Sequence, residues 1–400
     1  MKSPTVAVLL FWVVLFLFTW LKHFLSPAAR VGRAYKQIAG LMGQGKSREL
    51  TEYFERVFAG RRLLVRAFDR VWGAGFLELQ FAYHLFRIGR AEAALEQCSI
   101  AASKIDRHPA PALVGPVRLL HCRLLSEVGR YDESRAAASR CGVPLPSAAA
   151  AAEYYTGRMD EGLAIVRAAL DRDPEDNHAR FFGALILSAM GETRRALEML
   201  LFDPPKPPAP SMGPRHPWSD AYAGIDRMKK LEYVELQAGR FLMAASFSIA
   251  DRNVKESRWA LEKAKEFLST SLDNEHGYWI VQAEISAVEG NRAEVEAHLN
   301  RARETLARQP SRGKETIAAL NAAWCFVEVK DPAAAQTALD EARKVAFHPI
   351  EKHSCAFLTA RALELSGRSA EAADQYRRVV ADGFKTAAGT LAAQFLSRPS

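Results

Sequence analysis

The chain has 400 residues, of which 49% are hydrophobic and 25% are charged, and its net charge at pH 7 is +8. This balance excludes wholesale disorder, and the length allows two or three domains. Lys and Arg occur in scattered pairs rather than in stripes with aromatic residues, which argues against a nucleic acid partner. The five cysteines form no CxxC pair and the ten histidines show no metal-binding spacing, so we expect no metal or other cofactor.

The chain opens with an uncharged segment, residues 3–21, between Lys2 and Lys22. A helix of this length spans roughly 28 Å, close to the hydrocarbon thickness of a bilayer. We therefore predict a transmembrane anchor over residues 1–26, with a cleaved signal peptide as the alternative. The excess of basic residues after the span predicts a single-pass membrane protein whose soluble part is cytoplasmic.

Residues 27–70 are helical by pattern, and residues 40–47 (GLMGQGKS) within them fit the phosphate-binding P-loop, G-x-x-x-x-G-K-S. A P-loop follows a buried strand, whereas the preceding AYKQIA is amphipathic and helical, and no later strand supplies a magnesium site. A turn between two helices is the rival interpretation. A nucleotide hydrolase therefore stays as an alternative, and its binding residues would be Gly40, Gly45, Lys46 and Ser47.

A pattern recurs at a spacing of 34 residues, in the segments 157–174 and 191–204. Each segment has a turn Gly, then small and apolar residues at helical spacing, then Asp-Pro. The pattern resembles the tetratricopeptide repeat (TPR), although it lacks that family's Trp early in the first helix and its Tyr two residues after the turn. The resemblance implies an all-α solenoid of antiparallel helix pairs. An irregular all-α array is the alternative.

Looser copies of the pattern occur in both halves of the chain, at 89–102, 129–141, 255–268, 290–306, 330–346 and 367–380. Seven prolines between residues 204 and 217 predict a linker over 204–227, or alternatively a proline-rich ligand for a partner. We therefore expect one TPR-like block at 71–203, a second at 228–385, and a tail at 386–400.

The TPR resemblance also implies which residues face a ligand, because the first helices of such pairs line a concave groove. The positions ten and six residues before each turn include Tyr83, Arg123, Phe181, Leu185, Glu284, Trp324 and Arg361, together with Leu79, Leu119, Ile280, Leu320 and Phe357. Aromatic and aliphatic residues dominate this set, which favours an apolar or amphipathic peptide or helix as partner, although several members could fill the core.

No G-x-S-x-G or H-E-x-x-H motif occurs in the chain, so we expect no enzyme activity. The sequence as a whole predicts a membrane-tethered scaffold for protein–protein interaction. An assembly factor for envelope machinery is a further alternative.

Overall fold

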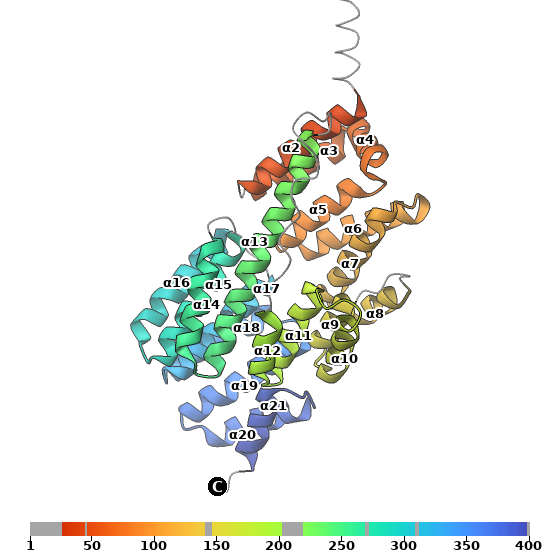
Figure 1. The fold of residues 1–400 in the computed structure, drawn as a ribbon. Helices are drawn as coiled ribbons and strands as arrows, with labels where there is room; N and C mark the ends of the chain where they lie inside the picture. The colour runs from red at the N-terminus through yellow and green to blue at the C-terminus, as the bar shows by residue number, and fades with distance from the viewer. Residues whose placement is uncertain are drawn as a thin grey trace, which may run out of the picture.

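The computed structural model describes residues 26–44, 46–140, 146–201, 219–268, 272–308 and 312–397. Every regular element in these ranges is a helix, and successive helices pair antiparallel and stack in chain order (Figure 1). The predicted all-α, TPR-like repeat architecture is therefore confirmed.

The first half of the chain contains α2 (Pro27–Gly43), α3 (Ser47–Gly60), α4 (Arg62–Trp72), α5 (Phe76–Arg87), α6 (Ala91–Arg107), α7 (Pro111–Glu127), α8 (Tyr131–Arg140), α9 (Pro146–Tyr155), α10 (Met159–Leu170), α11 (Asn177–Ala189) and α12 (Thr193–Leu200). The second half contains α13 (Ser219–Ala250), α14 (Val254–Leu268), α15 (Leu272–Val288), α16 (Arg292–Arg308), α17 (Arg312–Glu328), α18 (Pro332–Val345), α19 (Pro349–Leu365), α20 (Ser369–Ala381) and α21 (Ala387–Leu396). From α5 to α20, odd-numbered helices open the pairs and even-numbered helices close them, and α21 packs against the last pair.

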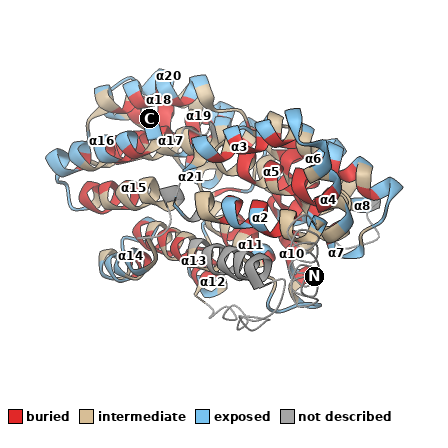
Figure 2. Cartoon of the chain, turned by 90° about the horizontal axis from the view of Figure 1, so that it is seen from above, coloured by how far each residue is buried: buried red, intermediate tan, exposed pale blue. Residues whose placement is uncertain are grey.

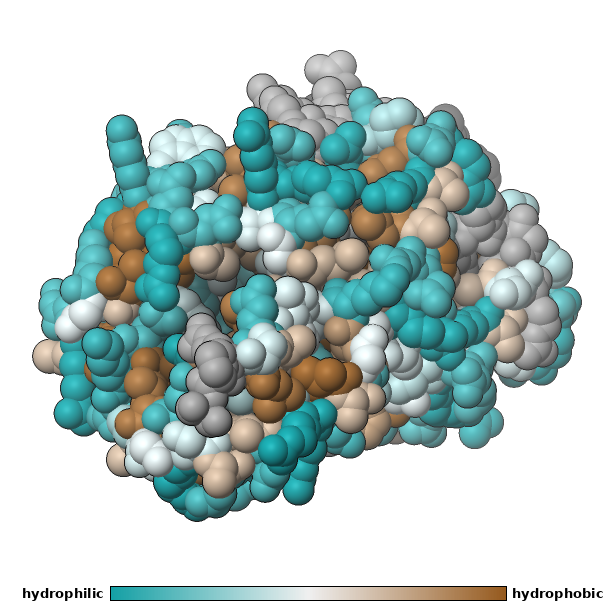
Figure 3. All heavy atoms as spheres, turned by 90° about the horizontal axis from the view of Figure 1, so that it is seen from below, coloured by the Kyte–Doolittle hydropathy of each residue, from teal (hydrophilic) through white to brown (hydrophobic). Residues whose placement is uncertain are grey.

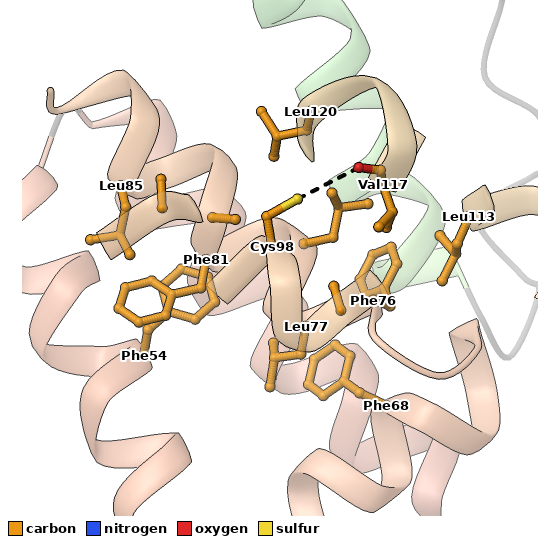
Figure 4. Packing of buried hydrophobic residues seen from close by; sticks show 14 of the residues in the cluster. Phe54, Phe68, Phe76, Leu77, Phe81, Leu85, Cys98, Leu113, Val117 and Leu120 are labelled. Carbon is orange, nitrogen blue, oxygen red and sulfur yellow. Dashed lines mark hydrogen bonds between the residues drawn. The ribbon is translucent and has the colours of Figure 1, made fainter. Parts of the chain in front are cut away.

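Buried residues lie on the sides of the helices that face neighbouring helices, and exposed residues lie on the outer sides (Figure 2). The first apolar cluster joins α2–α4 to α5–α7, so residues 27–70 are packed onto the repeats. In it the Phe54 and Phe81 rings stack with centroids 4.8 Å apart, and the Cys98 thiol lies 3.5 Å from the Val117 carbonyl (Figure 4). These contacts make the amino-terminal helices part of the same folded unit as the first repeats.

The second apolar cluster crosses the predicted linker, because it combines residues of α9–α12 with residues of α13–α15 and α19. The 32-residue helix α13 begins at Ser219, inside the range predicted as linker, and runs beside α2 (Figure 1). The two halves of the chain therefore share a core.

Membrane insertion finds no support in the described part of the chain, where no helix is both long and apolar enough to cross a bilayer. The longest helix, α13, carries acidic and basic residues along its length, and burying such charges in hydrocarbon is costly. The predicted location, a single-pass membrane protein with a cytoplasmic soluble part, is therefore corrected and not retained. Residues 3–21, on which that prediction depended, lie outside the described residues.

Two turn glycines permit a contact between distant parts of the chain. Gly129 and Gly157 have φ values of 80° and 79°, which other residues rarely adopt. A Cβ at Gly129 would lie 2.5 Å from the Phe347 ring, and a Cβ at Gly157 would overlap the ring of Phe384. The turns after α7 and α9 thus pack against the loops before α19 and α21, which closes the solenoid on itself.

Candidate functional site

The residues predicted to face a ligand all lie on the first helices of their pairs. Tyr83 lies on α5, Arg123 on α7, Phe181 and Leu185 on α11, Glu284 on α15, Trp324 on α17 and Arg361 on α19. Of the wider set, Leu79 and Ile280 are buried in the core, whereas Leu119, Leu320 and Phe357 are half-buried. The set is therefore mixed: some members fill the core and others still reach the surface.

Three of the apolar members, from both halves of the chain, pack against the same apolar cluster. Phe181 and Leu185 on α11 and Trp324 on α17 are each half-buried, and all three pack against the second apolar cluster. Phe181 meets the neighbouring Phe182 ring edge-on, with centroids 5.6 Å apart. The second apolar cluster therefore has half-buried apolar side chains from both halves of the chain at its boundary.

A group of polar side chains surrounds Arg123 on the carboxyl-terminal half of α7. The Arg123 guanidinium lies over the Phe86 ring, 4.8 Å from its centroid. Burial raises the pKa of Glu127, one turn further on, and Arg123 partly opposes that rise. Burial and the same Arg123 charge lower the pKa of His178 on α11, which favours a neutral imidazole. Arg123 is therefore the central cation of this region.

Tyr155, at the end of α9, joins this polar group to the second half of the chain. Its hydroxyl donates to Glu127 Oε2 across 3.3 Å, and burial raises the pKa of this phenol well above 10. Its ring stacks on His348 with centroids 4.0 Å apart and planes at 14°. His348 Nδ1 is also hydrogen-bonded to the hydroxyl of Tyr131, at 2.7 Å. These contacts from α7, α8 and α9 fix the start of α19.

Sequence reasoning missed Glu127, Tyr131, Tyr155 and His348 as members of this region. Tyr155 precedes the turn residue Gly157 by two positions, and Glu127 holds the same place before Gly129. This shared position near the end of a first helix is the sequence feature that could have identified both residues. The contacts with His348, however, depend on how the two halves meet.

Glu284, another predicted groove residue, lies inside the core with only 4% of its surface exposed. Within the described residues, its Oε2 atom has no hydrogen-bond partner. Burial raises the pKa of this carboxyl to about 7, and a hydrogen bond with Ser246 opposes the rise. Glu284 is therefore a buried carboxyl group of the core rather than a surface contact.

Arg361, the last residue of the predicted set, contacts side chains from the carboxyl-terminal part of the chain. Its Nη1 lies 3.0 Å from Glu364 Oε2, and its guanidinium lies over the Phe395 ring at 5.0 Å. The Phe395 ring stacks on Tyr376 with centroids 4.8 Å apart. Arg361 therefore helps to pack α21 against α19 and α20.

The described P-loop-like residues lie at the end of one helix and at the start of the next, whereas a P-loop follows a strand. Gly40 lies inside α2, and Ser47 is the first residue of α3. The Lys46 ammonium lies 3.3 Å from the Glu49 carboxylate, and Gly45 lies outside the described residues. A helix in place of the strand cannot present the loop amides to a phosphate as a P-loop does. Among the described residues, moreover, no group of three or more His, Cys, Asp or Glu could hold a metal ion.

Comparison with known proteins yields similarities of fold only. No protein-family model matches the sequence, and no match to a curated protein is found. Solved helical-repeat structures are similar at low sequence identity. The Cut9 and Hcn1 hetero-tetramer of the APC/C matches with a TM-score of 0.49 and 14% identity, over 84% of this chain and 59% of the other.

Two other solved structures match over nearly their whole lengths. A Rap protein in complex with competence and sporulation factor matches with a TM-score of 0.46 and 12% identity, over 92% of this chain and 99% of the other. A tetratricopeptide repeat protein from Parabacteroides merdae matches with a TM-score of 0.39 and 14% identity, over 81% of this chain and 97% of the other. Similarity at this level carries no argument about function, which must come from the residues themselves.

Proposed function

We propose that this protein is a non-enzymatic scaffold that binds an apolar or amphipathic peptide or helix along its first helices. The observation that carries the proposal is that Phe181, Leu185 and Trp324, all on first helices, are half-buried apolar side chains packed against one cluster that both halves of the chain share. Aromatic side chains in such positions contribute most to binding when a partner covers them. Tyr83, half-buried on α5, extends the same first-helix surface toward the amino terminus.

Polar groups near this surface determine which way the proposed partner lies on it. Arg123 supplies a cation that shares its surroundings with Glu127 and the neutral His178. A partner with a polar or acidic group beside its apolar face would fit this combination. We keep the division into blocks at 71–203 and 228–385 as a proposal, with the linker at 204–227 ending in the first turns of α13 and the tail at 386–400 containing α21.

The proposal is tested by comparing surface and core substitutions in one binding assay. Natural partners are captured from a lysate of the source cells, the dominant one is purified, and its dissociation constant is measured by calorimetry. Phe181→Ala and Trp324→Ala should each weaken binding at least tenfold. Leu187→Ala, at a fully buried position, should instead lower stability by roughly 2–5 kcal/mol.

Unchanged affinity in both aromatic variants would refute the proposal. So would unfolding of these variants as severe as that of Leu187→Ala, because the rings would then be core residues. Arg123→Ala adds a test of the polar edge, and we expect it to weaken binding while the apolar contacts persist.

A further inference from the structure

A cleft of about 860 Å³ lies along the second helix α6, beside the turn between α7 and α8. Its apolar surface consists of Leu95, Ile100 and Val128. Ile100 is 41% exposed, whereas Leu95 is buried. Residues of α6 that line the cleft recur every three or four positions from Glu92 to Arg107, so they form one face of the helix.

Charged groups of opposite sign mark the two ends of this α6 cleft. Glu92 and Glu96 lie at the amino-terminal end of α6, and Arg107 lies at its carboxyl-terminal end. Within the described residues neither carboxylate forms an ion pair, and Arg107 donates only to the backbone carbonyl of Ser103, at 3.2 Å. Arg130, which also lines the cleft, is neutralised by Glu133 at 2.5 Å.

End charges of this kind also stabilise α6 itself through its dipole, so alone they imply no ligand. Exposed apolar side chains are also common at the surface, where Figure 3 shows several separate hydrophobic areas among hydrophilic residues, and Leu63 on α4 is 67% exposed. The α6 cleft differs because its apolar surface lies between unpaired carboxylates at one end and an unpaired guanidinium at the other. These ends are 15 residues apart, or roughly 22 Å along the helix.

We propose that the α6 cleft binds an amphipathic helix of about four turns that runs antiparallel to α6, with an acidic first turn over Arg107 and a basic last turn over Glu92 and Glu96. Helices favour acidic residues at their start and basic residues at their end, so these charges fix the direction of the bound helix. Its apolar side chains, spaced by three and four residues, cover Ile100 and Val128. The cleft lies on a second helix, so this site is independent of the first-helix surface of the proposed function.

The test uses two labelled peptides of identical composition and the full chain. Both are 15-residue amphipathic helices with the same leucine face; one has an acidic first turn and a basic last turn, and the other has these charges exchanged. Fluorescence anisotropy should show at least tenfold tighter binding of the first peptide. Ile100→Lys should weaken that binding at least tenfold, and Leu63→Lys, the matched exposed control, should leave it unchanged.

Arg107→Glu provides a second, charge-based variant, which should reduce the preference for the first peptide at least threefold. Circular dichroism and melting curves confirm that each variant is folded. The proposal is overturned if neither peptide binds at millimolar concentration, if both bind equally, or if Ile100→Lys has no effect. It is also overturned if Phe181→Ala weakens binding while Ile100→Lys does not, since the peptide would then occupy the first-helix surface.

Discussion

Replacing Glu284 by glutamine should remove the loss of unfolding free energy that we expect for the wild type as the pH rises. The carboxyl is 4% exposed, and its Oε2 atom lacks a hydrogen-bond partner within the described residues. It faces Ser246 on α13 and lies near the Cys325 thiol on α17, and neither group offers a positive charge. Glutamine has nearly the same size and stays neutral at every pH, so it tests the charge alone.

The magnitude follows from the pKa of Glu284, which burial raises from 4.5 to about 7. At 1.36 kcal/mol per pKa unit this corresponds to roughly 3 kcal/mol. Because the folded protein binds this proton more tightly than the unfolded chain, the stabilisation is complete below pH 4.5 and is lost as the pH rises through 7. Between pH 5 and pH 8 the wild type should therefore lose roughly 2–3 kcal/mol that the Glu284→Gln variant keeps.

The assay is urea unfolding of wild type and variant from pH 5 to pH 8.5, with the difference in unfolding free energy plotted against pH. Taking the difference cancels the histidines, such as His121 and His178, whose pKa values burial lowers. The Cys325 thiol does not titrate in this range because burial raises its pKa well above 9. Glu304→Gln, at an exposed position, is the matched control and should give a flat difference.

A flat difference for Glu284→Gln would refute the reasoning, since it would mean that the carboxylate is solvated or paired in the folded state. A difference of opposite slope, with the variant losing stability as the pH rises, would mean that the ionised form is the one stabilised. Only a solvated carboxylate would make Glu284 a candidate surface contact again.

Further substitutions probe the turns, the ion pairs and the junction of the two halves. Gly157→Ala should cost roughly 2–4 kcal/mol in urea unfolding because it adds a clash to the backbone strain, whereas Gly290→Ala, with φ 77° and no atom within 4 Å, should cost only about 1 kcal/mol. Lys104→Met should cost roughly 2–3 kcal/mol by the same measurement, because it strips the buried Glu78 carboxylate of an ammonium 2.8 Å away. His348→Ala should speed amide hydrogen exchange in the turns that it contacts, while exchange in α14–α16 stays unchanged.

The repeat architecture could be predicted from sequence because its signals are local. A turn with positive φ requires glycine, and Gly157 and Gly191 have φ values of 79° and 85° in the positions that the pattern predicted. Apolar residues at helical spacing identified the buried faces, as at Leu163 and Val166, which are 4% and 0% exposed. These signals need no knowledge of distant parts of the chain.

The candidate site was less predictable because it depends on how far the solenoid curves. The contact of Tyr155 with His348 joins residues 193 positions apart, and the ion pair of Lys385 with Asp160 joins residues 225 positions apart. Each pair of helices is rotated slightly relative to the pair before it, and the accumulated rotation determines which turn contacts which loop. The burial of Glu284 could not be predicted for the same reason. Its position six residues before a turn predicted a groove residue, but the neighbouring helices bury it.

Helix α9 shows how composition carries information that periodicity does not. Its sequence, PSAAAAAEYY, has no amphipathic stripe, and Ala150, Ala151 and Ala152 are all fully buried. The helix contacts α7, α8, α10, α11 and α19, so it is surrounded by other helices. A helix in such a position requires small and apolar residues on all of its sides. Alanine lets these neighbours approach closely, and the approach brings the ring of Tyr155 onto His348. A run of alanines inside a repeat array therefore predicts a central helix, and the aromatic residues that end the run predict a junction.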